Sequence, residues 1–176
     1  EFKDSELGRI PQSWEVVIGN DVLKLGGGAS PSTITFCSDG DVLFMKVDDF
    51  NNPENYDEIA STSLSFLKES NKRIKIYPKG TVVIAKRGAA ILKNRVKLFS
   101  RETTVDSNLM TIEVSRYHPK FFLYYLQWED LSSLADTTSI PQLNNFHLYE
   151  HYFLMPPYKE QLKILEVALD CINNDK

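Results

Sequence analysis

The spacing of apolar residues changes once along the chain, and this change constrains the fold more than any other feature. Up to Val114 the apolar residues come in short runs bounded by turn-forming residues, which is typical of strands. The run at 81–85, which follows the turn at 78–80, is the clearest of these. From His118 onward, apolar residues recur at helical spacing. The sequence therefore predicts mainly strands up to Val114 and helices after it.

Individual elements can be placed within this division. The segment 14–25 is predicted to be extended and to stop at the glycines 26–28. Further strands are predicted at 42–47, 81–85 and 109–114, and a helix at 61–72. Pro119 suits the first position of a second helix, whose aromatic residues we interpret as core packing.

The end of the chain carries a regular apolar pattern. Its members are spaced by 4, 3, 4 and 3 residues, with charged residues between them: Tyr158, Leu162, Leu165, Leu169 and Ile172. This is a coiled-coil seam of about two heptads. The helix either folds back on its own domain or begins a longer spacer that pairs with another helix. We therefore divide the chain into a domain at 1–155 and the start of a helix at 156–176.

Composition limits the class of protein. A chain of 176 residues with 42% hydrophobic residues can bury one core. Cys37 and Cys171 lie far apart without a CxxC partner, so we expect neither a disulfide framework nor a cysteine zinc site. Apolar stretches are too short to span a membrane, and residues 1–4 lack a signal-peptide pattern. We expect a soluble, cytoplasmic protein with no membrane partner.

Charge is segregated along the chain. The net charge is -4, yet the segment 68–101 holds eleven basic residues and one acid. The rest of the chain carries a balance of -14. Such a basic segment is typical of a nucleic-acid footprint, although charge runs also arise as ordinary solvated faces.

Short motifs with a characteristic order cover nearly the whole chain. They are GRIPQSW at 8–14, GGASPST at 27–33, DGDV at 39–42, VDD at 47–49, PKGTVV at 78–83, KRG at 86–88, IPQLN at 140–144 and PPYKEQ at 156–161. In this order they resemble the target-recognition domain of the specificity subunits of Type I restriction-modification enzymes. The second motif departs from the family's G-G-T-P-S-T in having Ala29-Ser30 where a threonine is usual.

The resemblance implies a fold, a function and partners. The fold is α/β of an α+β-like kind, with a twisted mixed or antiparallel sheet, packed helices and a C-terminal helix that begins a coiled-coil spacer. The function is sequence-specific recognition of double-stranded DNA by a prokaryotic, non-catalytic chain without a cofactor of its own. Methyltransferase and endonuclease subunits are the implied partners. A typical subunit carries two such units, so this chain is either a fragment or a half-subunit that joins a second specificity half or forms a homodimer.

Side-chain chemistry selects the candidate DNA contacts. Forked or paired donors and acceptors read base edges, whereas lysines mainly hold phosphates. The candidate base readers are Arg87, Arg95, Gln142 and Asn144, and the candidate phosphate contacts are Lys86, Lys93, Lys97 and Arg101. The glycine loop at 26–28 with the hydroxyls of Ser30, Ser32 and Thr33 allows close backbone approach. Asn144 also suits a helix cap, and Gln142 could instead bond to nearby backbone.

Enzyme classes fit the sequence less well. The PPY at 156–158 resembles the tetrapeptide of amino-methyltransferases, but Met155 stands where that motif needs Asp or Asn. The segment 147–151 reads HLYEH and matches the inverted zinc-peptidase motif, in a poor context that leads us to expect no metal. A protein-interaction module without a DNA role is the remaining alternative.

Overall fold

The structure is a computed structural model that describes residues 1–136 and 139–174. A five-stranded sheet lies at its centre, in the order β4 (Leu23–Gly26), β12 (Leu109–Val114), β9 (Val82–Ala85), β10 (Val96–Phe99) and β7 (Glu58–Ile59). Neighbours pair antiparallel except β10 and β7, which pair parallel. The expected mixed sheet is confirmed. Strands β9 and β10 are buried along their whole length because their apolar side chains are covered on both faces.

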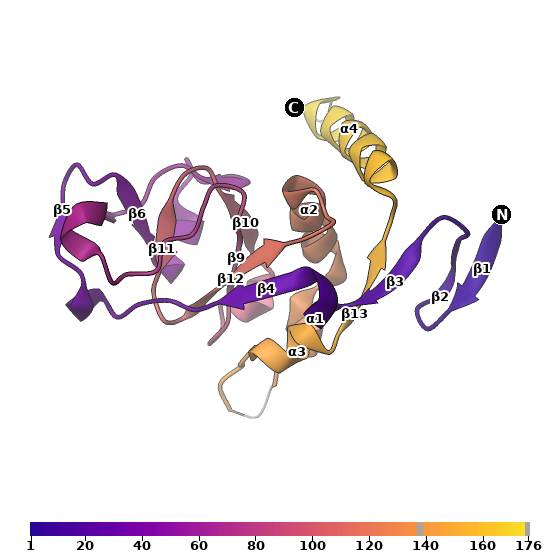
Figure 1. The fold of residues 1–176 in the computed structure, drawn as a ribbon, viewed down its shortest axis with the longest axis horizontal. Coiled ribbons are helices and arrows are strands. Elements are labelled where there is room, and N and C mark those ends of the chain that lie inside the picture. The colour runs from indigo at the N-terminus through magenta and orange to yellow at the C-terminus, as the bar shows by residue number, and fades with distance from the viewer. Residues whose placement is uncertain (137–138, 175–176) are drawn as a thin grey trace.

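A four-stranded sheet lies beside it, in the order β11 (Thr103–Val105), β6 (Val42–Met45), β8 (Leu64–Phe66) and β5 (Phe36–Cys37). This sheet has its own small core, formed by Ile34, Val42, Phe44 and Phe66. In Figure 1, β5 and β6 lie toward one end of the long axis of the molecule. We call that end the distal tip, and it comprises β5, β8 and the two short 3-10 helices η1 (Pro31–Thr33) and η3 (Lys68–Asn71).

Two small antiparallel pairs complete the β-structure. One is the N-terminal hairpin of β1 (Phe2–Ser5) and β2 (Gly8–Pro11), which lies at the other end of the long axis (Figure 1). The other joins β3 (Glu15–Ile18) to β13 (Tyr152–Met155), segments far apart in the sequence. Three further 3-10 helices lie in the connections, η2 (Val47–Asn51), η4 (Ile91–Lys93) and η5 (Leu131–Leu134).

Helix α2 (Pro119–Glu129) packs against β10 and begins as the sequence predicts. The Lys120 backbone N–H donates to His118 Nδ1 at 3.2 Å, which caps the helix before the proline. Phe121, Phe122 and Leu126 are buried, so the aromatic stripe is core packing, as expected. Two shorter helices, α1 (Gly19–Val22) and α3 (Asn145–Tyr149), contact each other.

Helix α4 (Tyr158–Asn174) packs on α2 through part of its predicted seam. Leu165 is buried and Leu169 and Ile172 are half-buried, whereas Tyr158 and Leu162 are exposed. Gln161, which is fully buried, accepts from the His118 N–H at 2.8 Å and donates to the Pro156 carbonyl at 2.9 Å. The start of α4 is therefore fixed to its own domain.

None of the described helices is both long and apolar enough to cross a membrane.

Two of the predicted elements are wrong. The segment 61–72 is not a helix, because β8 and η3 occupy it and β8 joins the distal sheet. The segment 14–25 is not one extended run, because α1 divides it into strands of two different sheets. A Cβ on Gly19 would stand 1.9 Å from the Leu148 carbonyl oxygen, so only glycine lets the chain turn against α3 at this point.

Candidate nucleic-acid interface

One end of the five-stranded sheet gathers most of the residues predicted to contact DNA. The register places the ends of β4 and β9 beside the starts of β12, β10 and β7. The loop after β4 begins at Gly27, so we call this the Gly27 end of the sheet. It comprises 27–30, 52–57, 86–88, 93–95 and 106–108.

Backbone hydrogen bonds join the segments at this end into a row. The Ala29 N–H donates to the Val105 carbonyl, and the Lys86 N–H donates to the Asn108 carbonyl, both at 2.9 Å. On the other side of 86–88, the Leu143 N–H donates to the Lys86 carbonyl at 2.9 Å. The segment 141–143 therefore adds to the Gly27 end, although it lies far away in the sequence.

One of the two glycines of this loop is needed for the row to close. A Cβ on Gly28 would stand 1.9 Å from the Asp106 carbonyl oxygen, so only glycine permits this contact. A Cβ on Gly27 would instead be 3.9 Å from Lys86 Nζ, and Gly27 is exposed. The ammonium of Lys86 therefore lies beside the exposed start of the loop.

Charge at this end is positive and partly buried. Burial lowers the pKa of Lys86 below the ordinary lysine value, and the neighbouring Arg87 lowers it further, while Asp106 partly offsets both. Burial raises the pKa of Asp106, although its carboxylate accepts from the Asn108 N–H at 2.7 Å. Lys86 therefore has a cation, Arg87, and a buried acid, Asp106, as charged neighbours, and an approaching anion would stabilise its ammonium.

Three of the four predicted base readers lie on two adjacent segments of the row. Arg87 lies on one segment, and Gln142 and Asn144 lie on or next to the other. Arg87 and Gln142 form an antiparallel bridge through their backbones, and both residues are exposed. The Gln142 backbone also pairs with Asp136, so its side chain is not needed for the backbone contacts. Asn144 is exposed at the N-cap position of α3, where its N–H donates to His147 Nδ1 at 2.9 Å. The fold therefore brings Arg87 and Gln142 side by side.

The other predicted residue near this group, Arg95, is engaged with the protein. Its guanidinium donates to the Phe50 carbonyl at 3.1 Å and to Asn51 Oδ1. It lines an open depression of about 450 Å³ together with Asn52 and Tyr56. Lys93 is exposed on η4, at the same end of the sheet.

One predicted phosphate contact needs correction, and another lies away from the Gly27 end. Lys97 is only 8% exposed, and its ammonium donates to the Asn55 and Tyr56 carbonyls. Burial lowers its pKa, and its function in the fold is to hold the loop before β7. Arg101 lies beyond the opposite end of β10 and donates to the Asp41 carbonyl at 2.7 Å. Neither residue presents a cation at the Gly27 end.

The predicted hydroxyl residues form an ordered turn on the loop that leaves β4. Ser30 Oγ and Ser32 Oγ lie 2.8 Å apart, and the Thr33 hydroxyl donates to the Ser30 carbonyl at 2.7 Å. All three residues are exposed around η1. The loop therefore carries polar groups from the Gly27 end toward the distal tip.

The histidines of the HLYEH segment face different acids. His151 Nε2 lies 2.9 Å from Glu129 Oε1, and His147 Nε2 lies 3.5 Å from Asp136 Oδ1. Helix α3 ends at Tyr149, between the two histidines, so they do not share one helical face. Within the described ranges 1–136 and 139–174, no cluster of three metal-ligating residues occurs.

Comparisons with known proteins identify the family of the chain. The family model of the Type I restriction modification DNA specificity domain matches residues 11–174. The MjaIX specificity subunit of a Type I restriction enzyme from Methanocaldococcus jannaschii is 29% identical over 100% of this chain and 42% of the relative. The MjaVIII specificity subunit from the same organism is 26% identical over 98% of this chain and 42% of the relative.

Solved structures show a similar fold. The HsdS subunit from Thermoanaerobacter tengcongensis superposes with a TM-score of 0.71 at 18% identity, over 99% of this chain and 40% of that one. A chain from a structure of a type I R-M system gives 0.73 at 20% identity, over 94% and 40%. The chain therefore spans about two fifths of the length of the proteins it matches.

Proposed function

Because this chain belongs to the Type I restriction modification DNA specificity domain family, we propose that it recognises a specific sequence in double-stranded DNA. The observation that carries this proposal is the family model, which matches 11–174 and so includes every segment of the Gly27 end. Reading a sequence requires side chains that reach base edges from a rigid frame. The row of hydrogen-bonded segments at the Gly27 end supplies such a frame.

Arg87 and Gln142 are the proposed base readers. A guanidinium fork suits the O6 and N7 acceptors of guanine, and a carboxamide suits the paired donor and acceptor of adenine. Their backbones are joined by a bridge, so the two exposed side chains start from neighbouring positions. This arrangement favours readout of adjacent base pairs.

Lys86 and Lys93 are the proposed phosphate contacts at the same end. Both are cations without an ion pair to any residue that the structure describes. Gly27 and Gly28 are exposed and Gly27 lies next to Lys86, so a DNA backbone can approach closely here. We leave Lys97 out of this set because it is buried.

The partners of the whole protein are also proposed by relation to the family. The relatives are specificity subunits of restriction enzymes, and this chain spans 42% of their length. We propose that the chain joins a second specificity half or another copy and directs methyltransferase and endonuclease subunits to a target half-site in the cytoplasm. The exposed Tyr158 and Leu162 on α4 offer apolar side chains for such an assembly. Catalysis and its cofactors would reside on those other subunits.

Selection of bound duplexes from a random pool tests the proposed function directly. The chain should enrich one short sequence motif, and an Arg87→Ala/Gln142→Ala variant should lose the enrichment. Lys79→Ala is the matched control, because Lys79 is exposed and lies before β9, at the opposite end of the sheet. If the unaltered chain enriches no motif, the proposed function is wrong.

A further inference from the structure

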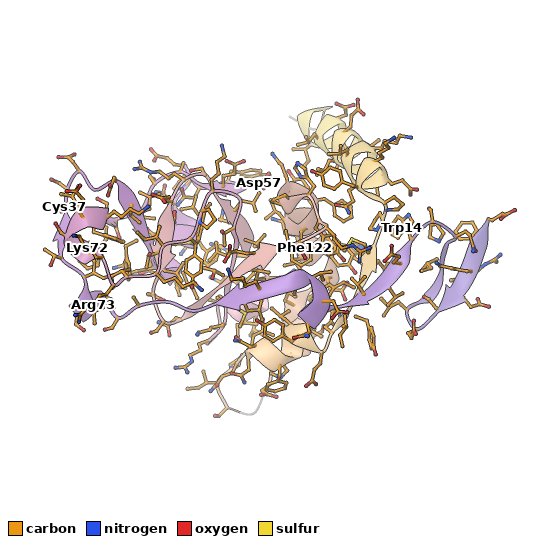
Figure 2. The ribbon with its side chains drawn as sticks, in the orientation of Figure 1. Trp14, Cys37, Asp57, Lys72, Arg73 and Phe122 are labelled. Carbon is orange, nitrogen blue, oxygen red and sulfur yellow. The ribbon has the colours of Figure 1, made fainter. Side chains whose placement is uncertain are left out.

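Two basic residues at the distal tip are exposed and unpaired. Lys72 and Arg73 directly follow η3 and lie toward the same end of the long axis as Cys37 (Figure 2). Neither forms a hydrogen bond or an ion pair with any part of the chain that the structure describes. Their basic neighbours differ, because Lys68 pairs with Glu102 at 2.8 Å and Lys75 lies over the Tyr77 ring. The tip therefore holds two available positive charges.

A buried asparagine fixes the position of this basic pair. Asn71 is 6% exposed, and its Oδ1 accepts from the Thr35 N–H at 2.9 Å. Its Nδ2 donates to the carbonyls of Thr35 at 3.2 Å and Leu67 at 2.9 Å. Asn71 thus holds the residues that follow it against the end of the loop 27–35, and the two cations extend from a rigid position.

The surface between these segments is hollow and polar. A depression of about 350 Å³ is lined by Thr35, Ser70, Lys72 and Arg73, with Glu69 among the other residues. The hydroxyls of Thr35 and Ser70 make no hydrogen bond within the described ranges. Two cations against one acid leave the depression with a net positive charge. Free hydroxyl donors beside cations are the groups that hold phosphate oxygens.

One loop connects this depression to the Gly27 end. The segment 27–35 starts beside Lys86 Nζ, lies against 105–106 through Gly28 and Ala29, and ends at the Asn71 contact. Ser30, Ser32 and Thr33 lie between the two ends and are exposed. The polar surface therefore continues from the proposed base readers to the distal tip.

We propose that Lys72 and Arg73, with the hydroxyls of Thr35 and Ser70, hold a backbone phosphate of the same DNA duplex at a second contact site. This inference rests on the proposed function, because the duplex is the ligand in both. The site is a phosphate contact and carries no sequence information. Its cations line an open depression, and the carboxamide of the buried asparagine beside them already bonds to backbone groups and does not read a base edge. It extends the interface beyond the Gly27 end and sets the orientation of the domain on the duplex.

The salt dependence of binding tests this site. We would measure fluorescence anisotropy of a random-sequence 30-base-pair duplex pool with the unaltered chain and with Lys72→Ala/Arg73→Ala, from low to physiological salt. Loss of two phosphate contacts should reduce the slope of log K against log salt by about 1.8. Lys159→Ala/Lys163→Ala removes the same charge from exposed positions on α4 and should leave the slope unchanged.

The outcomes separate the two proposals. If the tip variant keeps the slope of the unaltered chain, the second site is wrong, while selection of a sequence motif would still support the proposed function. If both double variants reduce the slope equally, the effect is one of net charge and the second site is also wrong. If the unaltered chain binds no duplex at low salt, both proposals are overturned.

The two cysteines provide an independent readout. Cys37 lies at the distal tip and Cys171 on α4, and both are free and exposed. A photoreactive aryl azide attached to Cys37 in the Cys171→Ser variant should cross-link to the duplex. The same group on Cys171 in the Cys37→Ser variant should cross-link at least several-fold less. Equal yields, or a lower yield from Cys37, would overturn the placement of DNA at the tip.

Discussion

The two ends of the five-stranded sheet use the same basic residue types in different ways. At the Gly27 end, Lys86, Arg87 and Lys93 take part in none of the ion pairs found among the described residues. At the opposite end, Lys24 pairs with Glu113 at 3.4 Å and Arg116 with Glu15 at 2.7 Å. Unpaired cations therefore gather at the Gly27 end, whereas two of the cations at the opposite end are paired with acids.

This difference shows that a basic residue indicates a DNA contact only when its partners within the protein are also known. Arg101 belongs to the same basic stretch of sequence as Arg87, yet its guanidinium is bound to the Asp41 carbonyl beyond the far end of β10. Exposed ion pairs contribute little to stability, so their main effect at that end is to remove free cations. A polyanion approaching the sheet would be attracted to the Gly27 end.

The largest expected effect comes from breaking the Gly27 end itself. Gly28→Ala would bring a Cβ to 1.9 Å from the Asp106 carbonyl oxygen, and the loop would have to move. We expect a loss of about 3 kcal/mol in the free energy of unfolding, at the upper end of overpacking effects, measured by urea denaturation. DNA binding should also weaken because the row of segments would separate.

Gly27→Ala is the control for this substitution, since its Cβ would meet only Lys86 Nζ, at 3.9 Å. It should change the free energy of unfolding by no more than about 0.5 kcal/mol. Similar losses for the two variants would show that close packing at Gly28 is not what fixes the loop.

The next largest effect is a change in base preference, which one arginine variant at each end of the sheet compares. Arg87→Ala should weaken binding to the selected duplex by about 1–3 kcal/mol and relax preference at one base position. Arg101→Ala at the opposite end should leave base preference unchanged. Anisotropy titrations with the selected duplex and with single-base variants measure both. Relaxed preference in Arg101→Ala, with none in Arg87→Ala, would reverse the assignment of the two ends.

A smaller effect concerns the pH dependence of binding. Burial lowers the pKa of Lys86, so this ammonium loses its proton at a lower pH than an exposed lysine does. Only the charged form attracts phosphate, and affinity should therefore fall as pH rises through that lowered pKa. The salt slope should fall by about 0.9 over the same range, as expected for one lost contact.

Lys86→Arg keeps its charge throughout this range, because the guanidinium is not deprotonated in proteins. Its affinity and salt slope should stay constant where those of the unaltered chain decline, in titrations between neutral and alkaline pH. Parallel declines in the two proteins would mean that Lys86 is not the titrating contact.

The smallest effect is expected at one of the ion pairs of the opposite end. Glu15→Gln breaks the exposed pair with Arg116 and should change the free energy of unfolding by less than about 1 kcal/mol. Thermal or urea unfolding measures this change, and anisotropy should show unchanged affinity for DNA. A marked gain in affinity would instead indicate that freed cations at this end also contact the duplex.

Strong hydrophobic patterns made several elements predictable. The strands predicted at 42–47, 81–85 and 109–114 correspond to β6, β9 and β12, and α2 begins at Pro119 as expected. The three strands are largely buried, so their own runs of apolar residues indicate both the strand and its burial. Strands of two residues, such as β5 and β7, are too short to show an apolar pattern, and they form only because a neighbouring strand is present.

The candidate site was predictable in residue type and not in position. Arg87 and Gln142 were chosen for their chemistry, and the bridge between them depends on a segment about fifty residues further along the chain. Lys97 was chosen for the same reason but lies in β10, a strand buried on both faces. Neither face of β10 is open to solvent, so the ammonium of Lys97 bonds to carbonyls inside the protein. Lys72 and Arg73 were part of the basic segment but were not singled out, because their availability depends on Asn71.

The sequence by itself determined the family motifs, three of the buried strands and the start of the two longest helices, because these depend on local pattern and burial. Only the tertiary structure decided which charges remain free. A cation is available when no acid or carbonyl lies within reach, and that depends on segments brought together by folding. The register of β4, β12, β9 and β10 set that outcome by placing Lys86 and Arg87 at one end and Arg101 at the other.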